Sequence, residues 1–123
     1  MTAEMIELGR RAVVCKGWRW LPGMRWEAPS HGTDGRLEDW EAPTWGAHRG
    51  EDDTVPDFSD PATIGCLLAL AREAWGCKIM CCWPAYTDDS EWWVSDGDDK
   101  DLRPKAKGAT EAEALVAALE AAP

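Results

Sequence analysis

Three cysteines gather in one short segment of the chain, Cys77, Cys81 and Cys82, and the two histidines are His31 and His48. Thiolate and imidazole groups are preferred zinc ligands, so these five residues are a candidate metal site. The spacing CKIMCC, however, is not the paired CxxC pattern of structural zinc sites. On a strand, Cys81 and Cys82 also point to opposite faces of the sheet. We therefore predict core thiols and no bound metal.

The acidic segment SDGDDKD, residues 95–101, has a carboxylate density that attracts calcium. It lacks the glycine at position six and the glutamate at position twelve of an EF-hand loop, so we expect a solvated loop. The sequence also contains no GxSxG, no Gly-rich phosphate loop and no HExxH. We predict no catalytic residues and no cofactor, and a small enzyme of unidentified chemistry is kept as an alternative.

The net charge of −10 is concentrated in two segments, since residues 28–60 carry −7 and residues 84–103 carry −5. This acidity argues against direct contact with nucleic acid and against docking on an anionic membrane. We predict a solvated, solubilising surface, with a docking surface for a basic partner protein as the alternative. The candidate interaction surface consists of Trp45, Glu51, Asp52, Asp53, Asp88, Asp89, Asp96, Asp98 and Asp99.

The location predicted from the sequence is the cytoplasm. No apolar run approaches the roughly 20 residues that a membrane helix needs, and the segment MTAEMIELGRR does not have the pattern of a signal peptide. The five cysteines are an odd number, which fits reduced thiols in a reducing compartment.

Hydrophobic periodicity places these groups on an α-β-β-α-β-β-α order of elements. Helices are predicted over residues 3–16, over residues 60–76 with Asp60 as the cap, and from the capping box at Thr110 onward. Strands are predicted over 18–27, within 37–45, over 78–83 and over 91–95, with a loop over 46–58.

The strand segments IMCCW and WWV are continuously apolar, which predicts that both faces of the sheet are covered. The fold class is therefore α+β, a three-layer α/β/α sandwich with a largely antiparallel four-stranded sheet. The nine tryptophans are expected mainly in its core, with Trp20, Trp75 and Trp92 largely buried. Residues 1–123 are predicted to form a single domain, with a variable loop-rich insertion around 28–56.

Four segments in this order resemble the phage α/β/α sandwich domain family of small phage proteins. They are CKGWRW, VPDFSDPATIGCLLALAREAWG, EWWVSD and GATEAEALVAALEAAP. The resemblance implies a three-layer fold and a phage or prophage origin, which would place the protein in the host cytoplasm. It implies no catalytic residues.

These observations predict a non-enzymatic phage or prophage accessory protein that acts through protein–protein contacts. One alternative is an acidic inhibitor of a host nucleic-acid-binding protein, of the anti-defence or nucleic-acid-mimic type. The small enzyme is the alternative of another class.

Overall fold

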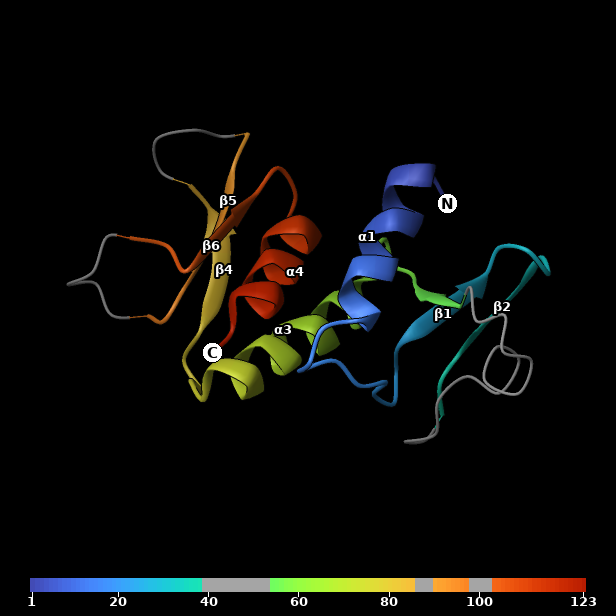
Figure 1. Cartoon of the computed structure of the whole chain (residues 1–123), viewed down its shortest axis with the longest axis horizontal. Coiled ribbons are helices and arrows are strands. Elements are labelled where there is room, and N and C mark those ends of the chain that lie inside the picture. Colours follow the sequence, from blue (N-terminus) through green and yellow to red (C-terminus); the bar gives the residue numbers. More distant parts are fainter. Residues whose placement is uncertain (39–53, 86–89, 98–102) are drawn as a thin grey trace. The chain divides into compact units, whose positions relative to one another are not determined.

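The computed structural model describes residues 1–38, 54–85, 90–97 and 103–123 (Figure 1). These residues form an α+β structure with three helices and two three-stranded antiparallel sheets. The helices are α1 (Ala3–Val13), α3 (Pro61–Trp75) and α4 (Glu111–Ala121). The strands are β1 (Arg25–Ala28), β2 (Thr33–Arg36), β3 (Val55–Pro56), β4 (Cys81–Pro84), β5 (Trp92–Ser95) and β6 (Ala106–Gly108).

The chain divides into two units. Unit 1 comprises Met1–Val14 and Trp18–Cys66, and unit 2 comprises Cys15–Gly17 and Leu67–Pro123. Each unit contains one sheet and one complete helix, while α3 contributes its first residues to unit 1 and the rest to unit 2.

In unit 1, helix α1 packs against β3 of the sheet β2-β1-β3. The Thr2 side chain caps α1 by accepting a hydrogen bond from the backbone N–H of Met5 at 3.2 Å. One of the unpaired donors of the first turn is thereby satisfied. Gly9 permits the close approach to the sheet, because a Cβ at this position would lie 2.8 Å from the Cβ of Val55. The buried apolar side chains of this unit include Leu8, Ala12, Met24, Trp26, Ala28, Val55 and Phe58.

In unit 2, helix α4 covers one face of the sheet β4-β5-β6 (Figure 1). Thr110 Oγ1 accepts a hydrogen bond from the backbone N–H of Glu113 at 3.1 Å, and the Glu113 carboxylate accepts one from the N–H of Ala109 at 2.9 Å. These two bonds form the predicted capping box. The Glu113 carboxylate binds the N–H of Ala109, which precedes the cap residue Thr110, and not the N–H of Thr110 itself. The buried apolar side chains of this unit include Leu67, Leu70, Met80, Val94, Leu115, Val116 and Leu119.

The predicted helices and the second predicted hairpin are confirmed. Each of the three helices lies within its predicted range, and Asp60 caps α3 by accepting a hydrogen bond from the backbone N–H of Thr63 at 3.0 Å. Strands β4 and β5 pair antiparallel within the segments predicted as 78–83 and 91–95. Strong periodicity and capping signals account for this agreement, because they are local properties of the sequence.

The strand prediction is wrong in three places. The first strand begins at Arg25, so Trp18 and Trp20 lie in an irregular segment. Strands β2 and β3 lie within the predicted loop-rich segment 28–56, and β6 was not predicted. Strand β2 has the sequence TDGR and β6 has the sequence AKG, so neither carries the apolar alternation that marks a strand.

The finer fold prediction is not confirmed. Each described sheet has three strands, whereas a single four-stranded sheet was predicted. In the strand predicted within 37–45, Leu37 and Glu38 are not in a strand, and residues 39–45 lie outside the described residues. The single domain and the α/β/α layering stay predictions.

Of the seven tryptophans that the structure describes, one is buried and six are partly exposed. Trp26 is buried, with 8% of its surface exposed, and its ring lies 3.0 Å from where a Cβ of Gly35 would be. The residues predicted to be largely buried remain partly exposed, and these are Trp20, Trp75 and Trp92. The most deeply buried large side chains are methionine and leucine, namely Met24, Leu67, Leu70, Met80 and Leu115.

The contact between β6 and α4 leads to a stability prediction. A Cβ on Gly108 would collide with the backbone of Glu113 and Ala114, whereas a Cβ on Gly65 of α3 would enter open space. We expect Gly108→Ala to destabilise the fold by about 3 kcal/mol, because the helix backbone must move. Gly65→Ala should stabilise it by about 0.5–1 kcal/mol, because glycine disfavours a helix interior.

Urea unfolding of the two variants and the unmodified protein checks this prediction. Equal unfolding midpoints for Gly108→Ala and Gly65→Ala would show that β6 and α4 are not in close contact.

Candidate binding sites

The acidic interaction surface predicted from the sequence is only slightly represented in the described structure. Asp96 is its one described residue; its side chain is 33% exposed and forms an ion pair with Lys105 at 3.8 Å. The other eight predicted residues lie outside the described residues, namely Trp45, Glu51, Asp52, Asp53, Asp88, Asp89, Asp98 and Asp99. The described structure therefore does not test whether this set forms one surface.

Within the cysteine cluster, Cys82 is a protonated thiol at neutral pH. Burial raises the pKa of Cys82 to about 12, and the negative charges of Glu111 and Cys81 act in the same direction. A thiol with so high a pKa is a weak nucleophile and a weak metal ligand at neutral pH. The Cys77 thiol donates instead to the backbone carbonyl of Asp96 at 3.5 Å.

All five cysteines are free thiols in the structure. His31 lies exposed in the turn after β1, and His48 lies outside the described residues. Across the described ranges, no three Cys, His, Asp or Glu side chains form a group that could hold a metal ion. Within the same ranges, no helix is both long enough and apolar enough to cross a membrane.

A pair of tryptophans lies on the face of the unit 2 sheet opposite α4. Trp83 of β4 lies directly opposite Trp93 of β5, which lies directly opposite Lys107 of β6. Directly opposed residues share one face of a sheet, and Glu91, two positions before Trp93, is on the same side. We name this surface the tryptophan face, and it consists of Trp83, Glu91, Trp93 and Lys107.

Helix α4 covers the other face of this sheet. The side chains on that face belong to the strand residues that alternate with those of the tryptophan face. Val94 is on that side and fully buried. The carboxylate of Glu111, in the first turn of α4, raises the pKa of Cys82, which lies directly opposite Val94. The indole rings of Trp83 and Trp93 therefore project away from the helix.

Two neighbours hold the ring of Trp93 in place. Its indole Nε1 donates to Glu91 Oε2 at 3.0 Å, and the ammonium group of Lys107 lies 5.6 Å from the ring centroid. The second contact is a cation–π interaction. A hollow of about 290 Å³ adjoins these groups, and Ser90, Glu91, Lys107, Gly108 and Ala109 line it.

Trp83 differs from Trp93 in its hydrogen bonding. Its indole Nε1 is buried and has no acceptor. A buried donor without a partner costs about 1–3 kcal/mol. The tryptophan face therefore combines a fixed aromatic ring, an unused donor and an exposed cation.

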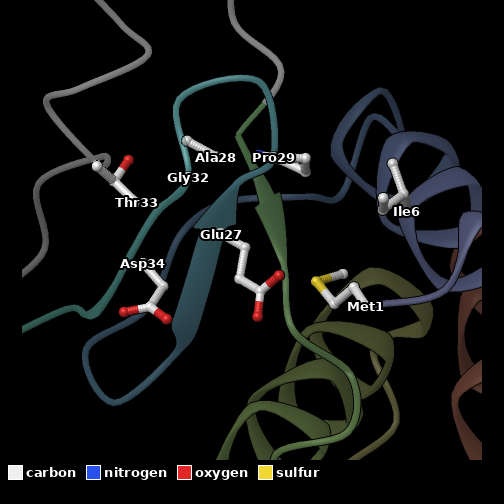
Figure 2. Close-up of a pocket in the computed structure, with 8 residues that line it drawn as sticks. All are labelled: Met1, Ile6, Glu27, Ala28, Pro29, Gly32, Thr33 and Asp34. Atoms are coloured by element: carbon white, nitrogen blue, oxygen red, sulfur yellow. The ribbon is translucent and has the colours of Figure 1, made fainter.

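A second pocket lies in unit 1, between the start of α1 and the β1–β2 hairpin (Figure 2). Its volume is about 270 Å³. The side chains of Met1 and Ile6 are apolar, Met1 also carries the α-amino group, and Glu27 and Asp34 contribute carboxylates. In Figure 2 the carboxylate of Glu27 extends toward the side chain of Met1.

A polar network anchors the hairpin of unit 1 to the start of α3. Arg36 donates two hydrogen bonds to the Asp60 carboxylate, at 2.7 and 2.9 Å. The same carboxylate accepts from the hydroxyl of Thr63 at 2.8 Å, and this hydroxyl accepts from the backbone N–H of Arg25 at 2.8 Å. The bonds from Arg36 are the main reason that the pKa of Asp60 lies well below its ordinary value.

The chain was compared with protein-family models, curated proteins and solved structures, and none of them matches it. The candidate sites are therefore argued from the geometry of the chain alone.

Sequence reasoning missed both sites for different reasons. For the tryptophan face, the relevant signal was the hairpin register, since pairing β4 with β5 sets Trp83 against Trp93. For the unit 1 pocket, no register could be predicted from the sequence, because β2, which lines the pocket, was predicted to be part of a loop-rich segment.

The low pKa of Asp60 leads to a prediction about acid stability. Its folded pKa lies below the unfolded value near 3.8, so its contribution is fully present above that pH and is lost as the pH falls toward the folded pKa. We expect the free energy of unfolding to decrease below about pH 4 in the unmodified protein, and to decrease less in Asp60→Asn. Asparagine keeps the helix cap and removes the titrating group.

Urea unfolding at pH 7 and pH 3 measures both losses, and Asp34→Asn, at a more exposed ion pair with Arg25, is the matched control. If Asp60→Asn lost as much stability between these pH values as the unmodified protein, the network would not depend on that charge.

Proposed function

We propose that this protein is a non-enzymatic binding protein that acts through protein–protein contacts, with the tryptophan face as its contact surface. The observation that carries the proposal is the state of Trp83, whose indole N–H is buried without an acceptor beside the fixed ring of Trp93. Tryptophan is enriched among the residues that dominate binding energy at protein interfaces. Its ring also loses little conformational entropy on binding when it is already held in place.

The unused groups of the tryptophan face define the partner by its chemistry. Trp83 Nε1 and the ammonium group of Lys107 are both donors, while the acceptor on this surface, Glu91, already binds Trp93. The fitting partner is a protein segment that places apolar side chains on the rings and offers acceptor oxygens, from backbone carbonyls or a carboxylate. Because Trp83 Nε1 is buried, such a segment would satisfy this donor only by turning the indole outward on binding.

The resemblance to small phage proteins supports a phage or prophage accessory role in the host cytoplasm and the three-layer arrangement, which we retain as part of the proposal. The second candidate is the acidic inhibitor of a host nucleic-acid-binding protein. It is supported by the charge of −10, and it would use the acidic segments to contact a basic partner.

Variants that change single groups of the tryptophan face test the proposal. Trp83→Phe keeps a large aromatic ring but removes the donor, and Lys107→Glu reverses the exposed charge. We expect each variant to weaken partner binding by about tenfold, because each removes a hydrogen bond or charge contact to the partner. Trp83→Phe should not destabilise the fold, because the lost N–H had no acceptor.

The measurement is affinity capture from host lysate, with binding of the captured protein then quantified by calorimetry. Val14→Ser is the matched control, since Val14 is 81% exposed and lies in unit 1. The indole N–H resonance of Trp83 should shift when the partner binds. A partner that binds all variants equally and leaves this resonance unchanged would rule out the tryptophan face as its contact surface.

A further inference from the structure

The indole of Trp83 is placed against the usual preference of tryptophan. In proteins the apolar body of a tryptophan packs inside, while its N–H finds an acceptor or reaches water. At Trp83 this arrangement is inverted, because Nε1 is buried without an acceptor although the residue as a whole is partly exposed. The atoms of this residue that meet water are therefore other atoms, and the one polar atom of the side chain is hidden.

Two tryptophans of the same unit show the ordinary arrangement. Trp75 Nε1 donates to the backbone carbonyl of Ala118 at 2.8 Å, and Trp93 Nε1 donates to the Glu91 carboxylate at 3.0 Å. Both residues are partly exposed, as Trp83 is. Partial exposure alone therefore does not leave an indole donor unpaired. A hydrogen bond holds the rings of Trp75 and Trp93 in one position, and the ring of Trp83 has no such bond.

Trp18 of unit 1 shares the unpaired donor, but its ring is held by packing. Its Nε1 is also buried without an acceptor. The ring packs edge-on against Trp20 and Phe58, whose ring centroids are 5.3 and 6.4 Å away. Within the described ranges, the indole of Trp83 makes neither a ring contact of this kind nor a hydrogen bond. No specific contact with a described residue therefore fixes its orientation.

The position of Trp83 in the sheet leaves room for its ring to turn. Strand β4 is at one edge of the described sheet, because it pairs with β5 alone. On the other side of Trp83, no described strand supplies a neighbouring side chain. Rotation about the Cα–Cβ and Cβ–Cγ bonds reorients an indole without moving the backbone, and the second torsion has broad minima. The N–H can thus move from its buried position to solvent while β4 stays paired.

We propose that Trp83 is a conformational switch in the tryptophan face. In one position the ring is turned inward and its N–H is buried. In the other it is turned outward, and its N–H is hydrated or bound to an acceptor oxygen. Turning outward relieves the unpaired donor but exposes more of the ring to water, and these opposing contributions are of similar size. Neither position is strongly favoured, and the unbound protein populates both.

The role of this switch rests on the proposed function, since it describes how the contact surface opens. A partner that needs the Trp83 N–H binds only the outward position and shifts the equilibrium toward it. Its apparent affinity is the intrinsic affinity multiplied by the fraction of molecules in the outward position. Trp93 stays in place throughout, because a hydrogen bond and the cation–π contact with Lys107 hold its ring.

The test is hydrogen exchange of the indole N–H groups in the full chain with ¹⁵N-labelled tryptophan, without any partner. We expect the Trp83 N–H to be protected by at most about tenfold relative to a free indole, because the outward position is well populated. The hydrogen-bonded N–H of Trp75, in the same unit, should exchange at least about tenfold more slowly than that of Trp83. Trp18 is the matched control for an unpaired donor held by packing, and it should also exchange at least about tenfold more slowly.

Fast exchange confined to Trp83 among these three residues supports the switch. Equal protection of Trp83 and Trp75 would overturn it. Fast exchange at Trp18 would overturn it as well, because the lack of an acceptor, and not the turning of a ring, would then set the rate. The contact surface is tested separately by partner capture with Trp83→Phe and Lys107→Glu. If those variants captured the partner normally, the proposed function would be rejected while the motion of Trp83 remained.

Discussion

The side chain of Asp60 is the point on which the arrangement of unit 1 depends. It caps the first turn of α3, binds Arg36 of the hairpin through both carboxylate oxygens, and accepts from Thr63, whose hydroxyl holds the backbone of Arg25. One carboxylate thus links the end of β2, the start of β1 and the start of α3. With 14% of its surface exposed it is largely shielded from water, so its charged bonds are worth more than those of a surface ion pair. The residues of α3 beyond Cys66 belong to unit 2, so a helix that starts at this carboxylate contributes to both units.

Short strands then decide which side chains are buried. In unit 1, Trp26 lies over Gly35, which leaves room for the indole on a narrow sheet. In unit 2, α4 lies so close to β6 that only glycine fits at position 108, and the small residues Ala112, Ala114 and Ala118 of α4 are buried. Trp92 shares that face with Val94, two residues further along β5. Trp83 and Trp93 lie on the opposite face by register, and both are partly exposed.

The helices could be predicted because their signals are local. Asp60 and Thr110 mark two starting points, and the apolar stripe of α4 is buried as predicted. The strands were harder, since β2 and β6 have few apolar residues and form only because β1 and β5 pair with them. The candidate sites were likewise hard to predict, because they depend on strand pairing. Charge density pointed to the acidic interaction surface, eight of whose nine residues lie outside the described part of the chain. The tryptophan face and the unit 1 pocket arise instead from cross-strand register. Register is the pairing of residues across two strands, and amino-acid composition does not determine it.

Both candidate sites are places where the chain departs from the rules that stabilise much of it. Several buried polar groups are paired: Trp75 Nε1 donates to the carbonyl of Ala118, and Arg72 donates to the carbonyl of Met80. Trp18 Nε1 and Thr33 Oγ1 are buried without a partner, as Trp83 Nε1 is. At Glu27 a carboxylate is placed opposite another carboxylate. Each departure costs stability in the isolated chain, and natural sequences tend to break such rules at functional sites. At Trp83 an acceptor oxygen relieves the cost only after the indole has turned outward, so a partner that binds there selects one position of the ring.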